Sequence, residues 1–228
     1  MALIITGASK GIGKYLFEEF SKKGFIVYGT FNSAKNIIDS GNLSKVDISD
    51  YESVSEWIFN LGDSLQDIVL INCAGVTYNS FAHKSDIDRW HKVIDINLKG
   101  TFNVIRQVLP IMRSQNYGRI ITFSSVVVNY PTPGISAYAA SKAGLIGLTK
   151  TIAVENASKG ITANTINLGY SNIGMGLYDV PTEYQEQLKS KIPNGRFCNP
   201  LEILNTVEYI INNEYFNGSS IDINGGLI

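Results

Sequence analysis

Short apolar runs rich in β-branched residues alternate along the chain with longer amphipathic runs. The short runs predict strands and the longer ones, with apolar positions three or four apart, predict helices. Strands are expected at residues 2–6, 25–30, 43–48, 67–75, 119–128, 161–169 and 219–225. Helices are expected at residues 14–24, 50–61, 86–97, 99–114, 136–159 and 200–213.

Turn and cap residues set the expected boundaries of these elements. Gly24 is placed to close the first helix, and Asp50 to cap the start of the second. Pro110 and Gly118 are expected to mark the end of the helix that starts at residue 99.

Regular alternation of strand and helix, with strands that are apolar throughout, is typical of a parallel sheet covered by helices on both faces. The chain shows no internal repeat and no linker-like segment. We therefore predict one α/β domain over residues 1–228, a Rossmann-type doubly wound sheet of about seven strands. Ligands of such sheets bind at the carboxyl ends of the strands.

Composition narrows the function classes. The 228 residues carry a formal net charge of −1, with 44% hydrophobic and 17% charged residues. Such a balance gives no support for a nucleic-acid or anionic membrane surface. No apolar run approaches the roughly 20 residues of a membrane-spanning helix. The opening "MALIITGASKGIG" has no basic leader, so we expect no secretion signal.

The two cysteines, Cys73 and Cys198, form neither a disulfide framework nor a metal-binding set. We expect buried or half-buried free thiols and no bound metal. Free thiols fit a reducing compartment, so we predict a cytoplasmic protein.

A glycine-rich segment, "TGASKGIG" (6–13), follows the first strand and opens the first helix. Gly7, Gly11 and Gly13 allow a tight turn and a close approach to a pyrophosphate, which the helix N-terminus favours through its amides and dipole. The alternative is a turn with a purely structural role.

The second strand ends "YGTFNS" (28–33) without the acid that usually binds the ribose 2′-hydroxyl of NAD, and Asp39 lies too far along. Lys10 and Lys35 are near enough to favour a 2′-phosphate. We predict that NADP(H) is preferred and NAD(H) possible. The alternative is that both lysines are simply solvated.

Taken together, seven segments in order along nearly the whole chain resemble the single-domain branch of the short-chain dehydrogenase/reductase family, and most closely its bacterial 3-oxoacyl-(acyl-carrier-protein) reductases. The segments are TGASKGIG (6–13), NCAG (72–75), NLKG (97–100), ITFSS (121–125), YAASK (138–142), GRF (195–197) and NGSSIDINGG (217–226).

The resemblance implies four catalytic residues: Asn97, Ser125, Tyr138 and Lys142. Tyr138 and Lys142 are four apart on one helix face. A free tyrosine has a pKa of about 10, so we expect the Lys142 ammonium and the nicotinamide to lower it and make Tyr138 the acid/base. Ser125 would hold the substrate carbonyl, Lys142 would also bind the nicotinamide ribose, and Asn97 would anchor a water that leads to Lys142.

The same resemblance implies the cofactor-binding residues, with Asp47 placed to accept from the adenine amino group. They are Gly7, Ser9, Lys10, Gly11, Ile12, Gly13, Asn32, Asp47, Ile48, Asn72, Ala74, Gly75, Tyr138, Lys142 and Gly169.

The segment after residue 166 departs from the family pattern. Leu168 replaces a proline and Ile173 a threonine that contacts the cofactor, a contact that Ser171 or Asn172 would have to replace. Residues 170–195 are expected to form a mobile cover over the substrate. Its candidate pocket residues are Tyr170, Met175, Leu177 and Tyr178.

We expect an NADP(H)-dependent oxidoreductase that interconverts a carbonyl and a secondary alcohol on a small molecule. Reduction of 3-oxoacyl groups on acyl carrier protein is the alternative, although "SQNYGR" (114–119) lacks that branch's basic pair and only Lys159 matches a basic position. A non-catalytic nucleotide sensor is a further alternative. A homotetramer or homodimer would form through helices 99–114 and 136–159, with Leu145, Ile146, Leu148 and Ile152 serving either the contact or the core.

Overall fold

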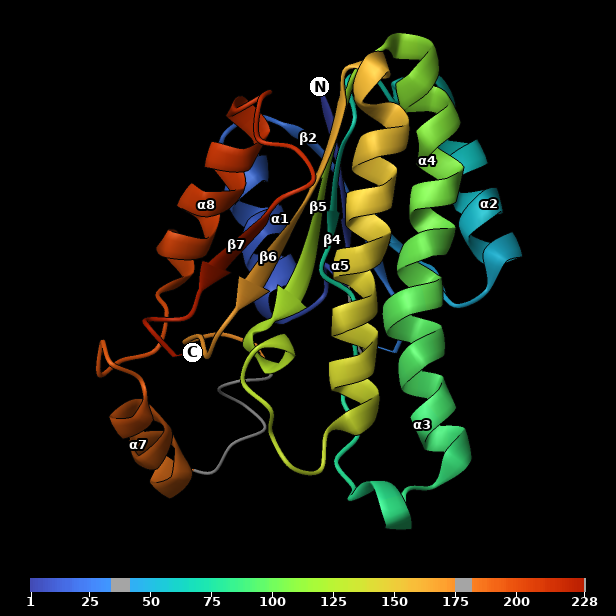
Figure 1. The fold of residues 1–228 in the computed structure, drawn as a ribbon. Helices are drawn as coiled ribbons and strands as arrows, with labels where there is room; N and C mark the ends of the chain where they lie inside the picture. The colour runs from blue at the N-terminus through green and yellow to red at the C-terminus, as the bar shows by residue number, and fades with distance from the viewer. Residues whose placement is uncertain (34–41, 175–181, 228) are drawn as a thin grey trace.

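Seven strands form one parallel sheet in the computed structural model, which describes residues 1–33, 42–174 and 182–227 (Figure 1). The strands are β1 Ala2–Thr6, β2 Ile26–Phe31, β3 Leu43–Lys45, β4 Val69–Asn72, β5 Gly118–Ser125, β6 Ile161–Leu168 and β7 Ser220–Ile223. Their spatial order is β3-β2-β1-β4-β5-β6-β7, and each neighbouring pair runs parallel. The predicted doubly wound Rossmann-type sheet is confirmed.

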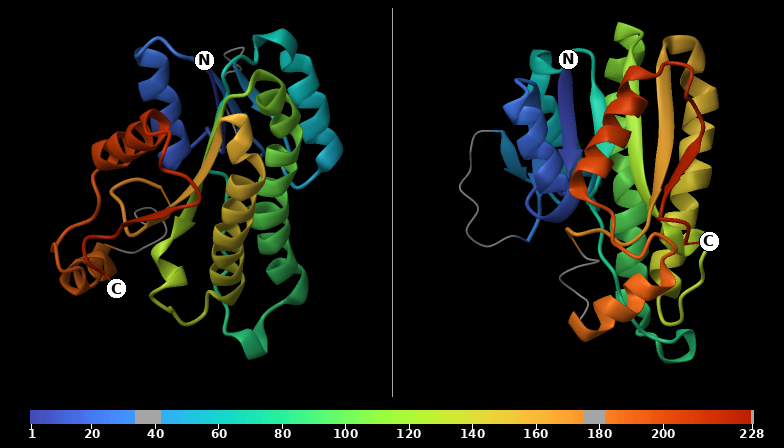
Figure 2. Two further views of the ribbon diagram at one scale, coloured as in Figure 1. Left: turned by 45° about the horizontal axis from the view of Figure 1, so that its top comes forward. Right: turned by 90° about the vertical axis from the view of Figure 1, so that its left-hand side faces the viewer.

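Helices cover both faces of this sheet (Figures 1 and 2). On one face lie α1 Gly11–Lys22 and α8 Pro200–Asn212, and on the other lie α2 Tyr51–Leu61, α4 Thr101–Gln115 and α5 Ser136–Asn156. Helix α3 Ile87–Ile94 continues through a π-helical segment, Asp95–Gly100, into α4. Helix α7 Thr182–Lys191 lies beyond the carboxyl ends of the strands.

Alternation along the strands builds two cores. In β1, Ala2 and Ile4 face the cluster under α2, α4 and α5, whereas Leu3 and Ile5 face the cluster under α1 and α8. All four side chains are buried, which explains why β1 has no polar alternation. Because both faces are covered, successive residues can all be apolar.

Polar caps fix two of the helix starts. The Asp50 carboxylate accepts from the Glu52 amide at 3.0 Å, as expected for the cap of α2. At α8, Asn199 and Glu202 form a reciprocal capping box around Pro200. These caps position the helices that close the two faces.

Two features of the helix ends differ from those expected. Helix α1 begins at Gly11 and not at residue 14, so the glycine loop itself supplies its first turn. Pro110 lies inside α4, which continues to Gln115 and ends at Asn116 in a left-handed conformation with φ 53°. Arg106 and Pro110 are both exposed, so the hydrogen bond that the proline cannot donate is lost on the solvent side, where water can replace it.

The other differences concern strand ends and the cover. The strands expected at 43–48, 67–75 and 119–128 are shorter, and residues 126–128 form a 3-10 turn. The expected cover 170–195 contains helix α7, which we did not anticipate. Lys35, Asp39, Met175, Leu177 and Tyr178 lie outside the described residues.

The strand order reverses between β1 and β4, which places a crevice at the carboxyl ends of these two strands. Most of the expected cofactor-binding residues follow β1, β2, β3 and β4, and Ser125 ends β5, so these residues meet at the carboxyl ends of the strands. Across the described ranges, no helix is both long enough and apolar enough to span a bilayer.

Candidate active site

The glycine loop after β1 has a backbone that only glycine accommodates easily. Gly7 and Gly11 have φ of 69° and 56°, in the left-handed region. A Cβ on Gly7 would lie 2.8 Å from the Ala74 Cα, and one on Gly13 would lie 2.3 Å from the Gly7 oxygen. The Gly7 amide donates to the Thr30 hydroxyl at 3.3 Å. The loop is therefore tight, and it presents backbone at its surface.

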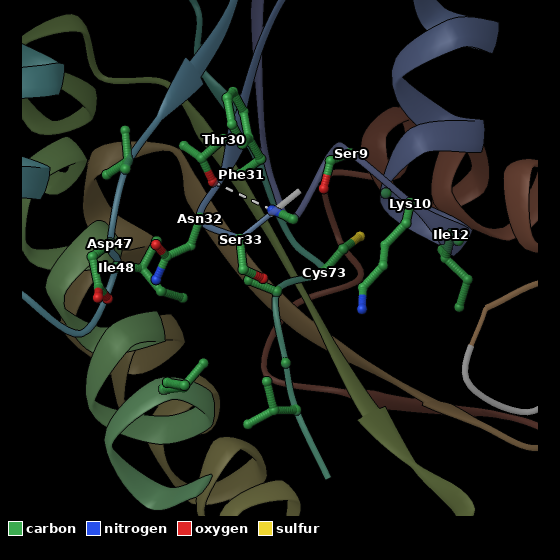
Figure 3. Close-up of a pocket in the computed structure, with 18 of the residues that line it drawn as sticks. Ser9, Lys10, Ile12, Thr30, Phe31, Asn32, Ser33, Asp47, Ile48 and Cys73 are labelled. Carbon is green, nitrogen blue, oxygen red and sulfur yellow. Dashed lines mark hydrogen bonds between the residues drawn. The ribbon is translucent and has the colours of Figure 1, made fainter. Parts of the chain in front are cut away.

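A cavity of about 560 Å³ opens beside this loop and continues along the ends of β2, β3 and β4 (Figure 3). Figure 3 shows Lys10 on one side of it, with Asp47 and Ile48 on the opposite side. Most of the cofactor-binding residues expected from the sequence line it: Gly7, Ser9, Lys10, Gly11, Ile12, Gly13, Asn32, Asp47, Ile48, Ala74 and Gly75.

Four expected residues do not line this cavity. Asn72 is buried and donates to the Thr122 hydroxyl at 3.3 Å, so it ties β4 to β5. Gly169 packs against the end of β7: a Cβ on Gly169 would lie 2.9 Å from the Cα of Asn224, the residue after that strand. Tyr138 and Lys142 come from α5, beyond the Gly75 end of the cavity.

The cavity holds one carboxylate among its described lining residues, Asp47. Ser49 donates to this group through its amide at 2.9 Å and its hydroxyl at 2.6 Å, and Asn32 donates from the segment directly after β2. These hydrogen bonds, the Ser49 hydroxyl first, hold the pKa of Asp47 below its ordinary value. Lys10 and Lys92 supply two ammonium groups, and neither forms an ion pair with another described residue.

Sequence reasoning missed several lining residues. Lys92 and Ile96 approach the cavity from α3 and the π-helical segment, and Ser33, Cys73 and Gly174 also line it. The spacing of Lys92 and Ile96, one helical turn apart on the approach to Asn97, was the available signal. Cys73 is a free thiol, and burial raises its pKa to about 12.

Asn97 lies in the π-helical segment and is fully buried. Its side chain pairs with the backbone of Val76, accepting from the amide at 2.8 Å and donating to the carbonyl at 3.0 Å. It also donates to the Ser141 hydroxyl at 3.0 Å. Its main-chain carbonyl accepts from Thr101 at 2.8 Å. The bulge aims the amide at the loop after β4, where the cavity ends.

Ser125 ends β5, and its hydroxyl is hydrogen-bonded with that of Tyr138 from α5. Lys142 does not lower the pKa of Tyr138 in this structure, and a lowering by the nicotinamide stays a prediction. Burial raises this pKa, and the hydrogen bond with Ser125 opposes the rise only in part. Lys142 has no such effect because its ammonium donates to the Phe123 carbonyl and not to the phenol oxygen. The Lys142 Nζ lies 5.6 Å from the centre of the Tyr138 ring.

Lys142 is buried, and its ammonium forms a 2.6 Å hydrogen bond with the Phe123 carbonyl. Burial lowers its pKa to about 8, and Cys73 opposes that change. A Cβ on Gly75 would lie 3.4 Å from the Asn97 Oδ1 and 3.7 Å from the Lys142 Nζ, so both groups meet at this glycine. The four expected catalytic residues are thus grouped at the carboxyl end of β5.

Backbone hydrogen bonds to Cys198 hold the first residues of the segment after β6. Asn172 donates to the Cys198 carbonyl at 3.0 Å, and the Cys198 amide donates to the Tyr170 carbonyl at 2.9 Å. The Ser171 hydroxyl donates to the Ile173 carbonyl at 2.8 Å, so its proton is already used. Gly174 then reaches the cavity, where a Cβ on Gly11 would lie 2.9 Å from its Cα.

These features fit a dinucleotide. Helix α1 starts at the glycine loop with no acidic residue in its first turn and no side-chain cap, so its amides remain for an anion. The close packing of Gly7 and Gly13 leaves the loop backbone uncovered, and the cavity extends to Asp47 and Asn32. A nicotinamide dinucleotide would place its phosphates at this loop and its adenosine towards β2 and β3.

Comparison with known proteins gives the same picture. A family model described as short chain dehydrogenase matches residues 1–180. The 3-oxoacyl-(acyl-carrier-protein) reductase of Thermotoga maritima is 37% identical over 239 residues, which cover 99% of this chain and 96% of the relative. The reductases of the same name from Staphylococcus aureus and Haemophilus influenzae are 35% and 31% identical, each covering 98% of this chain and 96% of the relative.

The sheet order, the glycine loop and the group at the end of β5 agree with these matches over nearly the whole length. The chain therefore belongs to the short-chain dehydrogenase family, as an NAD(P)-dependent oxidoreductase that acts on a CH–OH group.

Proposed function

We propose that the protein interconverts a ketone and a secondary alcohol on a small molecule, with NADP(H) as its preferred cofactor and Tyr138 as acid/base. The observation that carries the proposal is the hydrogen-bonded Ser125–Tyr138 pair beside a cavity that fits a dinucleotide. When bound, the cofactor supplies or accepts the hydride.

The residues of this chain orient the substrate and move the proton. The Ser125 hydroxyl donates to the carbonyl oxygen and holds it near the Tyr138 phenol, which gives up its proton in the reductive direction. A raised pKa suits this acid role, since Tyr138 is protonated at neutral pH. Lys142 stabilises negative charge on the phenol oxygen as it develops, and Asn97 orders the approach to Lys142.

Preference for NADP(H) follows from charge. The described part of the cavity has the two lysines Lys10 and Lys92 against one carboxylate, and hydrogen bonds from Ser49 and Asn32 occupy that carboxylate. The end of β2 presents Phe31, Asn32 and Ser33 without an acid that would repel a 2′-phosphate.

Titration with NADPH and NADH, followed by fluorescence of the reduced cofactor, tests this preference on wild type and Lys10→Ala. We expect NADPH to bind at least about tenfold more tightly, and Lys10→Ala to remove most of the difference. A wild-type protein that binds NADH equally well would refute the preference. Oxidation of NADPH with a cyclic ketone, a vicinal diketone and a 3-oxobutanoyl thioester of N-acetylcysteamine then tests the reaction.

Reduction of 3-oxoacyl groups on acyl carrier protein is the second candidate, and the printed names of the relatives favour it. Charge placement argues against it. Lys159 precedes β6 and lies at the opposite end of the strands from Ser125, and the segment 114–119 before β5 lacks the basic pair of that branch. Matched 3-oxobutanoyl substrates on acyl carrier protein and on N-acetylcysteamine discriminate the two. A KM lower by about a hundredfold with the carrier would favour the second candidate.

We also propose a homodimer or homotetramer through α4 and α5, in a cytoplasmic protein. Phe102 on α4 and Val154 on α5 are 44% and 81% exposed, whereas the Leu145 and Ile152 side chains are buried in the core. Light scattering of wild type and Val154→Glu tests the contact. A mass that is monomeric in both would refute it.

A further inference from the structure

The serine between the catalytic tyrosine and lysine has no assigned role. Ser141 lies on α5, one residue before Lys142, and is fully buried. Its hydroxyl donates to the Tyr138 carbonyl at 2.8 Å and accepts from the Asn97 amide at 3.0 Å. Both functions of the hydroxyl are thus used, and they join Tyr138 to Asn97.

The amide of Asn97 has a single consistent orientation in this network. Its oxygen accepts from the Val76 N–H, while its nitrogen donates one hydrogen to the Val76 carbonyl and the other to Ser141. Rotating the amide by half a turn would place donor against donor at Val76. Ser141 is the contact that fixes this amide to α5, the helix that carries Tyr138 and Lys142.

Removing the hydroxyl would release the connection between two elements. Asn97 belongs to the π-helical segment and Ser141 to α5. Without Ser141, one amide hydrogen of a fully buried asparagine would have no acceptor, which is costly. The amide would relieve this by turning or shifting, and Asn97 would move relative to Lys142, which shares the surroundings of Gly75.

We propose that Ser141 is a positioning residue for the reaction, which acts by holding the Asn97 amide in register with Tyr138 and Lys142. This inference rests on the proposed function for its kinetic consequence but not for its structural one. Ser141 is not among the described residues that line the cavity, and within that part of the chain its hydroxyl meets only the main chain of Tyr138 and the amide of Asn97, so any effect on the reaction passes through these two residues.

Kinetics provide the first test, with the ketone that the wild type reduces fastest and NADPH. We expect Ser141→Ala to lower kcat about tenfold while the Kd for NADPH stays within about twofold. In the Asn97→Ala background the same change should have almost no further effect, since the two residues act as one unit. Additive losses in this double-mutant cycle would overturn the proposal.

Two further variants separate positioning from packing. Ser141→Thr keeps a hydroxyl that can bond a carbonyl of the preceding helical turn, and should restore most of the lost rate. Thr149→Val is the matched control: Thr149 is buried on the same helix, with a hydroxyl that has no partner among the described residues. It should leave kcat unchanged.

Hydrogen exchange gives a readout that needs no activity. The Val76 amide donates to Asn97, which protects it from exchange, so Ser141→Ala should speed its exchange at least about tenfold. The β5 amides of this variant should exchange at the wild-type rate, and so should the Val76 amide of Thr149→Val. Unchanged Val76 exchange would overturn the proposal even if every carbonyl screen failed. Faster exchange with no turnover of any carbonyl would instead refute the proposed function alone.

Discussion

The ammonium of Lys142 crosses from α5 to β5 and donates a 2.6 Å hydrogen bond to the main-chain carbonyl of Phe123. This contact anchors the lysine at the strand end, where Tyr138 and Ser125 also lie. Burial works against the charge so held and lowers the pKa of Lys142 to about 8. A charged group that is less stable in the folded protein makes folding depend on pH.

The stability of the cofactor-free protein should rise between pH 7 and pH 9 because of Lys142. The folded state holds this proton less tightly than the unfolded chain, whose lysine has a pKa of 10.5. The buried charge therefore lowers the free energy of unfolding while Lys142 is protonated. This loss disappears as the pH rises above the pKa of Lys142 in the folded state. Lys142 alone should contribute a gain of about 1 kcal/mol over this window in urea unfolding, and the total gain of the wild type should be smaller because the two cysteines act against it near pH 9.

Lys142→Met isolates the lysine from every other titrating group. The difference in unfolding free energy between wild type and variant should change by the same amount over the window. The Cys73 and Cys198 thiols, with pKa values raised from 9.0 to about 12 and about 11, act in the opposite direction as the pH approaches and passes 9. Both proteins contain these thiols, so the difference between wild type and variant largely removes their effect, and measurements should stop at pH 9. If the difference in unfolding free energy stays constant from pH 7 to 9, burial does not lower the pKa of Lys142.

Tyr138→Phe removes the proposed proton donor and keeps the ring. The Ser125 hydroxyl loses its partner, but the cavity that would hold the cofactor is lined by other residues. We expect kcat for ketone reduction to fall about a thousandfold, and the Kd for NADPH to change less than about threefold. Steady-state rates and fluorescence titration measure the two. A variant that keeps a tenth of the wild-type rate would exclude Tyr138 as the acid.

The fold could be predicted because the pattern of apolar runs is governed by burial on two faces. Ala2, Leu3, Ile4 and Ile5 are apolar in sequence and buried in alternation, as a central parallel strand requires. The glycine loop was predictable for a similar reason, since the contact of Gly13 with the Gly7 oxygen excludes any side chain.

What could not be predicted depends on three-dimensional surroundings. Pro110 suggested a helix end, but its ring faces solvent and the helix continues. The effect of Lys142 on the Tyr138 pKa could not be predicted, because the sequence shows that Lys142 is four residues away but not which atom its ammonium bonds. Lys92 was missed because its place in the cavity, with Asp47 and Ile48 from the segment after β3, follows from how α3 packs beside α5.

Lys92 lines the cavity and lies near enough to Asp47 to lower the pKa of that carboxyl, so it should contribute to charge recognition of the cofactor. We expect Lys92→Met to weaken 2′,5′-ADP about threefold to tenfold, and AMP by less, measured calorimetrically at low and physiological salt. Lys84→Met is the control, since Lys84 is exposed and is not among the residues that line the cavity. Equal weakening of both nucleotides would place Lys92 at the base or ribose and not at the added phosphate.

Two glycines with contrasting surroundings test the packing of the glycine loop. A Cβ on Gly13 would lie 2.3 Å from the Gly7 oxygen and 2.9 Å from the Gly7 carbon, so the loop would have to open. A Cβ on Gly147, exposed in the middle of α5, would meet nothing within 4 Å. We expect Gly13→Ala to cost about 1–3 kcal/mol, and Gly147→Ala to gain about 0.5–1 kcal/mol by restricting the unfolded chain.

Urea unfolding at two protein concentrations, together with NADPH titration, measures both effects. Gly13→Ala should lose NADPH affinity as well as stability, because the displaced Gly7 backbone belongs to the cavity lining. Gly147→Ala should keep its affinity, and a gain that depends on protein concentration would reveal a subunit contact at α5. If Gly13→Ala were as stable as wild type and bound NADPH normally, the close packing of Gly7 and Gly13 would not be needed to shape the site.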